Sequence, residues 1–201
     1  MTDLKDDISY MRRLAEQGRS GPILGGTFLA AAGIIFGLTC FAQWAVLTGL
    51  LPMTPEHIVD IWLGAGALFA VLWIVLFRRL RARTGLRGGA SNVVFGVAWV
   101  SSAIGIVVTC CMMAIVATVT GSSAVLELNV PIGFVFYGIA WCAAAMLARR
   151  YWMYIASAGS FLTTLLLAAL TNDPRQIAVM GVALLLLLSV PGLKMMFDEP
   201  R

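Results

Sequence analysis

The sequence predicts an all-α fold: a polytopic membrane protein with six transmembrane helices in a compact bundle and a short N-terminal amphipathic helix. Composition is the first observation behind this prediction. Of the 201 residues, 60% are hydrophobic and 12% are charged, and the mean hydropathy is +0.91. Soluble domains carry about 25% charged residues. The chain therefore has too little polar surface to face water on all sides.

Long uncharged stretches are the second observation. Six apolar stretches divide the chain. Each is long enough, or nearly so, for the roughly 20 residues that cross a ~30 Å hydrocarbon core at 1.5 Å per residue. Backbone groups in lipid must bond one another, which leaves helices or closed barrels. A barrel would show alternating segments, whereas residues 183–188 are continuously apolar, so helices are predicted.

The distribution of basic residues is the third observation, and it predicts how the chain is threaded. If the six spans alternate in direction, every one of the 14 basic residues except Arg175 falls on the same side. Basic loops are retained on the cytoplasmic side of a membrane. We therefore expect a multi-pass protein of the cell (inner) membrane with both termini in the cytoplasm.

The predicted organisation has three parts. Residues 1–21 form a cytoplasmic amphipathic helix, because apolar residues from Leu4 to Leu14 recur at helical spacing among charged neighbours. Residues 22–197 form the transmembrane domain, and residues 198–201 form a cytoplasmic tail. The six predicted spans cover about 22–51, 58–77, 91–120, 130–148, 151–170 and 175–193.

The first two spans carry residues that favour helix starts and close packing. Pro22 suits a first helical turn, and Gly33 with Gly37 forms a GxxxG pair that lets another helix approach. In the second span, Thr54 is the predicted N-cap and Pro55 the first helical residue.

The next three spans have clear boundaries. Ser91 or Asn92 can cap the third span, and Pro131 fits the first turn of the fourth. Arg149 and Arg150 stop the fourth span, and the fifth begins directly after them with interfacial aromatic residues. The turn between these two spans must therefore be tight.

The sixth span has a start signal and a stop signal. Asp173 is the predicted cap, Pro174 follows it, and Gln176 stands at the capping-box position. Pro191 is expected to end or kink the helix, because proline lacks the backbone N–H that a helix needs.

Residues with catalytic potential are scarce. The sole histidine is His57, and no Gly-x-Ser-x-Gly, His-Glu-x-x-His or phosphate-binding glycine motif occurs. Glu56, His57 and Asp60 share a helical turn, where helix capping explains the acids better than a metal site does. The cysteines stand in apolar runs without metal-ligand spacing: Cys40, Cys110, Cys111 and Cys142. We expect no catalytic residue, no metal and no cofactor.

Ionisable residues are missing from the middle of the predicted spans, where they would mark ion-coupled transport. This pattern argues against coupled transport and leaves a facilitator for a neutral solute open. The segment 95–99 resembles 137–141 in a span of opposite direction. Such a pair fits an inverted repeat, and it also arises by chance in glycine- and alanine-rich helices.

One group of aromatic residues is predicted at similar depth in the inner half of the membrane. Trp73, Trp99 and Trp141 lie within a few turns of the cytoplasmic ends of their spans, and Tyr137 precedes Trp141 by one turn. Buried indole N–H groups need partners. These four residues are a candidate ligand pocket. The alternative is ordinary packing with interface anchoring.

A second candidate site lies between the second and third spans. Five arginines stand there in a predicted loop that is available to a protein partner or to anionic lipid head groups: Arg78, Arg79, Arg81, Arg83 and Arg87.

The leading functional hypothesis is a non-enzymatic integral membrane accessory, scaffolding or regulatory subunit. It would contact the lipid bilayer, and it would bind a protein partner through residues 1–21 or through the loop Arg78–Arg87. A homo-oligomer is a further expectation, and nucleic acid is not expected as a partner. The alternative is a small transporter or channel for a neutral or hydrophobic solute. A membrane enzyme acting on lipid is the third hypothesis.

Overall fold

The computed structural model describes residues 25–84 and 90–198, in which helices and short turns occur and no strand does. The helical elements are α2 (Gly26–Leu47), α3 (His57–Thr84), α4 (Ala90–Thr120), η1 (Ser123–Leu128), α5 (Asn129–Ala148), α6 (Tyr151–Ala169), α7 (Arg175–Leu184), η2 (Leu185–Ser189) and α8 (Val190–Asp198). Six helical segments are long and apolar enough to cross a membrane. The predicted all-α polytopic bundle is therefore confirmed.

Some predicted features fall outside the described residues. The amphipathic helix at 1–21, Arg87 and the residues 199–201 are among them.

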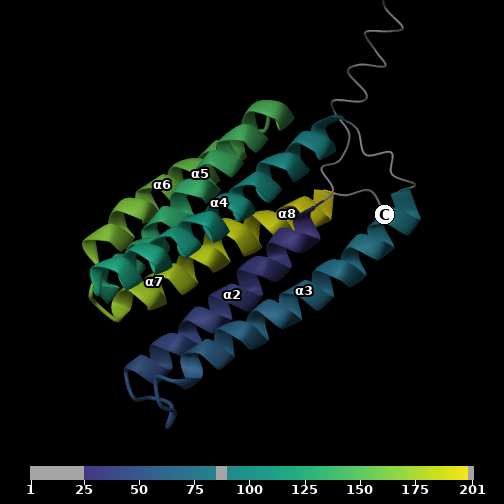
Figure 1. Cartoon of the computed structure of the whole chain (residues 1–201). Coiled ribbons are helices and arrows are strands. Elements are labelled where there is room, and N and C mark those ends of the chain that lie inside the picture. Colours follow the sequence, from purple (N-terminus) through teal and green to yellow (C-terminus); the bar gives the residue numbers. More distant parts are fainter. Residues whose placement is uncertain (1–24, 85–89, 199–201) are drawn as a thin grey trace, which may run out of the picture.

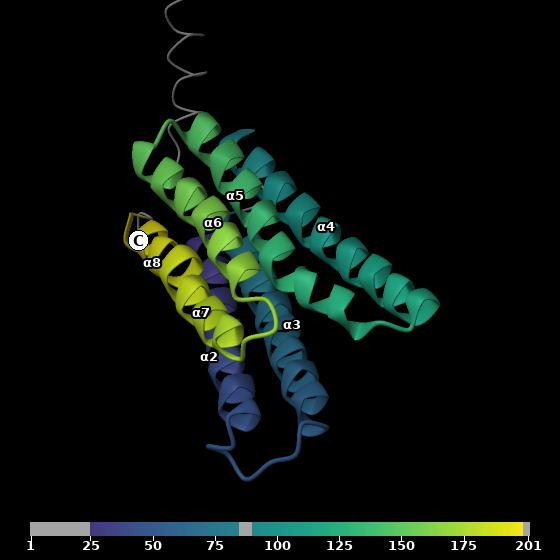
Figure 2. The ribbon, with the colours of Figure 1, turned by 90° about the vertical axis from the view of Figure 1, so that its left-hand side faces the viewer.

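The helices form two packing groups (Figure 1). In the first, α2 packs against α3 on one side and against α7, η2 and α8 on another. The elements α7, η2 and α8 follow one another without a break and together form the α7–α8 span. In the second group, α5 packs against both α4 and α6. The groups meet where α6 lies beside the α7–α8 span, as Figure 2 shows.

Two apolar clusters fill the contacts between these elements. One cluster draws residues from α2, α4, α5, α6 and α8: Leu29, Phe95, Trp141, Ala144, Ala145, Met153, Ala156 and Met195. The other joins α2, α5, α6 and the α7–α8 span: Cys40, Phe134, Leu167, Ala183, Leu184 and Leu188. Both clusters cross from one packing group to the other, so they bind the two groups into one bundle.

Glycines set the close approach of α2 to the α7–α8 span. A Cβ atom on Gly33 would lie 2.7 Å from the backbone nitrogen of Ser189, and one on Gly181 would lie 3.0 Å from the carbonyl oxygen of Gly37. Real side chains do not tolerate the first of these separations. The Gly33/Gly37 pair thus permits backbone-to-backbone packing, which is the usual role of such pairs in membrane helices.

Pro191 does not end the helix in which it lies. An uninterrupted α-helix would bond the Leu187 carbonyl to the amide of residue 191, and proline has no N–H to donate. The chain passes this point through a π-helical turn, η2 (Leu185–Ser189), and continues as α8. The indole Nε1 of Trp141 donates to the Leu187 carbonyl at 3.0 Å. In place of the expected kink, the helix therefore has a π-helical turn, and Trp141 of α5 donates a hydrogen bond to it.

Helix α3 differs from its prediction at both ends. It begins at His57, after a turn in which the Thr54 hydroxyl lies 2.9 Å from His57 Nδ1. Thr54 therefore contacts the imidazole ring of the first helical residue, which lies three residues later, and Pro55 is not the first helical residue. At the other end, α3 continues to Thr84, so Arg78–Arg83 lie on a helix and not in a loop. Arginine favours helix, which explains the extension.

The start of the α7–α8 span follows only part of its predicted pattern. Asp173 Oδ1 accepts a hydrogen bond from the Arg175 amide at 2.8 Å, as a capping carboxylate should. Gln176 does not complete a capping box. Its side chain is buried, and Nε2 donates at 2.9 Å to the carbonyl of Leu167 near the end of α6. That carbonyl also accepts the Leu170 backbone amide at 3.2 Å, so the Gln176 side chain bonds an acceptor of the neighbouring helix in place of its own helix start.

Candidate functional site

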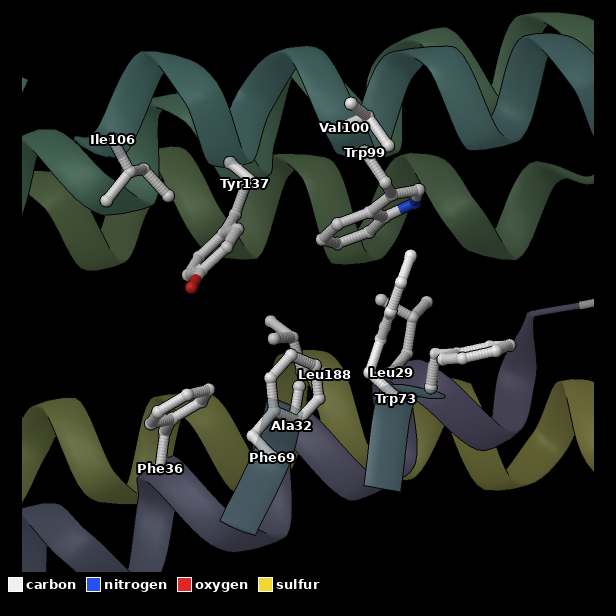
Figure 3. A pocket seen from close by; sticks show the side chains of 12 residues that line it. Leu29, Ala32, Phe36, Phe69, Trp73, Trp99, Val100, Ile106, Tyr137 and Leu188 are labelled. Atoms are coloured by element: carbon white, nitrogen blue, oxygen red, sulfur yellow. The ribbon is translucent and has the colours of Figure 1, made fainter. Parts of the chain in front are cut away.

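A cavity of about 250 Å³ lies between the two packing groups (Figure 3). Its lining comes from five elements: Phe28, Leu29, Ala32 and Phe36 of α2, Phe69 and Trp73 of α3, Trp99, Val100, Ala103 and Ile106 of α4, Tyr137 of α5, and Leu188 of η2. The spacing along α2 and α4 is that of one helical face. Each helix therefore presents a continuous stripe to the cavity.

The cavity lies between α3 and α4, which pack along different helices. Helix α3 packs along α2 and α4 packs along α5, and in the described ranges these two helices do not pack along each other. Trp73 and Val100 line the cavity and remain 44% and 56% exposed. The cavity is therefore open between two helices whose outer faces are apolar, which is the side that lipid would cover.

Aromatic rings form both walls. On the α2–α3 side, Phe28 lies 6.4 Å from Trp73 and Phe36 lies 5.3 Å from Phe69, measured between ring centroids. On the other side, the Trp99 and Tyr137 rings are 6.0 Å apart. These separations are typical of favourable aromatic pairs. Figure 3 shows the two walls facing each other across the cavity.

Two polar atoms of the far wall have no hydrogen bond. The Tyr137 hydroxyl points into the space between the walls (Figure 3), and no partner for it occurs among the described residues. Trp99 Nε1 is buried and unpaired in the same part of the chain. An unpaired buried donor costs about 1–3 kcal/mol. By contrast, Trp62 Nε1 donates to Gln43 Oε1 at 2.8 Å.

The sequence-predicted pocket residues divide into two kinds. Trp73, Trp99 and Tyr137 line the cavity. Trp141 does not: it is fully buried, lies edge-on to Trp99 with ring centroids 5.3 Å apart, and donates to Leu187. Trp141 therefore has a packing role. Because Pro191 has no N–H to donate to the Leu187 carbonyl, that carbonyl accepts the Trp141 indole instead. Whether the cavity binds a ligand stays a prediction.

Sequence reasoning missed the phenylalanines of the near wall. Phe28 and Phe36 lie two turns apart on α2, and Phe69 precedes Trp73 by one turn on α3. An aromatic stripe on one face of each helix was the available signal. It was obscured because lipid-facing surfaces of membrane helices are equally apolar.

Four of the five predicted arginines lie within the described residues, and Arg87 lies outside them. Arg78 and Arg79 are exposed on α3, while Arg81 and Arg83 belong to the same helix. At the same end of the bundle, the Lys194 ammonium lies 4.9 Å from the centre of the Trp152 ring. Such cation–π contacts hold a basic group near an interface. Contact of the arginines with a partner or with lipid stays a prediction.

A second, polar cavity of about 230 Å³ lies at the other end of the bundle, lined by Gln43, Leu47, Glu127, Asn172, Asp173, Pro174, Gln176 and Ile177. Its polar groups already have partners. A Glu127 carboxylate oxygen accepts a hydrogen bond from the backbone N–H of Asn172 at 2.6 Å. The Gln43 side chain accepts from Trp62, and the Gln176 side chain donates to the Leu167 carbonyl. These bonds tie the connecting segments together, which gives this cavity a structural role.

Among the described residues, no group of three His, Cys, Asp or Glu side chains could hold a metal ion. The four cysteines are free, and Cys40 is buried in the core. Comparisons with protein-family models, with curated proteins and with solved structures give no match.

Proposed function

We propose that the protein binds a neutral, largely apolar molecule inside the bilayer and acts as a carrier or receptor for it, without catalysis. The observation that carries this proposal is the aromatic cavity between α2–α3 and α4–α5. Ligand sites are concave, mostly apolar and furnished with a few polar groups. This cavity has that character, with the Tyr137 hydroxyl as its free polar group.

The lining supports a neutral ligand. None of the described residues that line the cavity carries a charge. An ionised group placed in such surroundings would lose its hydration without gaining a partner. A charged solute would need a side chain of opposite sign, as coupled transporters provide.

The route of entry follows from the packing of α3 and α4. Both helices expose apolar side chains on the faces that flank the cavity, including Leu68 and Ile104. A molecule dissolved in the bilayer could pass between them without crossing water. The proposal therefore concerns a ligand that partitions into lipid.

The location proposed for the protein is the inner membrane, with both termini in the cytoplasm. The exposed arginines Arg78, Arg79 and Arg149 and the exposed Lys194 support this orientation, because they gather at one end of the bundle while Arg175 lies at the other. A fluorescent protein fused after Arg201 should fluoresce in bacteria. Activity of a periplasmic reporter at the same position would contradict the orientation.

The decisive experiment is purification in native nanodiscs followed by intact-complex mass spectrometry. We expect a stoichiometric small molecule on the wild-type protein. Ala103→Phe, which fills the cavity from α4, should release it. Ala67→Phe, on an exposed position of α3 outside the lining, is the matched control and should retain it. Equal retention by both variants would exclude the cavity as the site.

A second candidate function, the accessory subunit, has one observation in its favour. Helix α3 packs on α2 and exposes most of its remaining surface, including Val59, Leu63 and Val71. Such a surface suits another helix as well as lipid. The same mass spectrum tests this idea, because a stoichiometric second protein would support it. Deletion of residues 1–19 should then abolish that association without preventing membrane insertion.

A further inference from the structure

We infer that the cavity recognises a neutral lipid with a carbonyl oxygen on a flat ring, the chemistry of a quinone, through a hydrogen bond from the Tyr137 hydroxyl. This inference rests on the proposed function, and it adds the class of ligand. Three features of the described residues carry it: the depth of Tyr137, its unpaired hydroxyl and the aromatic walls.

Depth excludes lipids with charged head groups. Tyr137 lies near the middle of α5 (Asn129–Ala148). At 1.5 Å per residue, ~12 Å of helix separates it from one end of α5 and ~16 Å from the other. The ester carbonyls of a phospholipid stay beside its head group at the membrane surface. A carbonyl that reaches Tyr137 must therefore belong to a molecule that can enter the hydrocarbon core entirely.

The hydroxyl selects a hydrogen-bond acceptor. Tyr137 points its oxygen into the cavity (Figure 3) and has no hydrogen bond in the described part of the chain. In lipid, no water compensates for a missing bond, so a ligand with an acceptor gains more than a plain hydrocarbon. A second unpaired donor, Trp99 Nε1, lies in the adjacent ring of the same wall. The wall formed by Trp99 and Tyr137 therefore carries two hydrogen-bond donors that have no acceptor in the described part of the chain.

The two walls favour a flat ring between them. Phe36, Phe69 and Trp73 face Trp99 and Tyr137 across the cavity (Figure 3). Aromatic faces are electron-rich, and a ring that bears carbonyl groups is electron-poor, so the two attract when stacked. The aliphatic residues Leu29, Ile106 and Leu188 extend the lining and suit an attached hydrocarbon chain.

The test compares two ligands that differ in the carbonyl groups. Purified full-length protein in detergent is titrated with decyl-benzoquinone or with decylbenzene, and bound molecules are counted by intact-complex mass spectrometry. We expect the quinone to bind about five-fold more tightly, the ratio typical of one neutral hydrogen bond. Tyr137→Phe should remove this preference, so that the variant binds the two ligands about equally. The exposed Tyr154 provides the matched control, Tyr154→Phe, which should keep the preference.

The outcomes separate this inference from the proposed function. Equal binding of both ligands, unchanged by Tyr137→Phe, would overturn the carbonyl inference and leave an apolar binding protein. Tighter binding of a monoacylglycerol than of the quinone would overturn the choice of a ring. Failure of wild-type protein to bind any of the three would overturn the proposed function itself.

Discussion

Helix α2 has two faces that meet their neighbours in opposite ways. Its glycine face, with Gly26, Gly33 and Gly37, lies against the α7–α8 span at backbone contact. Its aromatic face, with Phe28 and Phe36, borders the cavity. Without a hydrophobic effect between helices in lipid, packing depends on how closely backbones approach. Small side chains therefore make the tight contact, and large side chains hold the neighbouring helices apart.

The largest expected effect comes from breaking the glycine face. Gly33→Leu would drive a side chain into the backbone of Ser189 and Leu184, where a Cβ would already be 2.7 and 2.8 Å away. We expect a loss of about 3 kcal/mol or more in the free energy of unfolding, because backbone cannot move aside cheaply. Unfolding by titration with SDS, followed by tryptophan fluorescence, measures it.

The control for this change is Gly64→Leu. Gly64 lies on α3, and a Cβ there would meet nothing within 4 Å. Its stability should match that of the wild type. Equal destabilisation by the two substitutions would show that glycine itself, and not the contact with the α7–α8 span, matters for stability.

A smaller change in unfolding free energy is expected for two tryptophan substitutions, and the two should differ. Trp141→Phe would leave the Leu187 carbonyl without its indole donor, which should cost about 1–3 kcal/mol of unfolding free energy. Trp99→Phe removes a donor that has no partner and should cost less than about 0.5 kcal/mol in hydrogen bonding. The same SDS titration compares them. A larger loss for Trp99→Phe would contradict the assignment of Trp141 to structure and Trp99 to the cavity.

The smallest effect concerns the contact between α5 and α6. Ser157 is buried and its hydroxyl donates to the Gly138 carbonyl at 2.8 Å. Hydrogen bonds between membrane helices contribute about 0.6 kcal/mol on average, so Ser157→Ala should shift the unfolding curve slightly. Ser101→Ala, at an exposed position of α4, is the control and should leave the curve unchanged. A shift of several kcal/mol for Ser157→Ala would show a wider role for this serine.

The sequence predicted the fold class because hydropathy and length identify membrane helices directly. It also named Trp73, Trp99, Trp141 and Tyr137 as one candidate pocket, since the depths of the three tryptophans follow from counting residues along their helices. It could not distinguish Trp141 from the other three. That distinction depends on Pro191, which is distant in sequence and whose missing N–H leaves a carbonyl beside Trp141. Which side chains meet between two helices depends on how each helix is rotated about its own axis, and the hydropathy of a sequence does not report that rotation.

Two other predictions failed for different reasons. Gln176 was expected to close its own helix start, and it bonds α6 instead. The stretch Arg78–Arg83 was expected to be a loop, and it is helical. For Gln176, a carbonyl of the neighbouring helix bonds the side chain that the local pattern assigned to capping. For the arginine stretch, intrinsic helix preference extends α3 beyond the predicted end of its span.

The glycine face of α2 has a consequence for how the protein is made. Its partner, the α7–α8 span, is synthesised more than a hundred residues after α2 has entered the membrane. During that interval the ribosome adds four further helices while the glycine stripe remains uncovered, and the bundle closes once residues 175–198 are inserted. A chain that stalls before this point leaves the glycine face of α2 without the backbone surface that it contacts in the finished bundle.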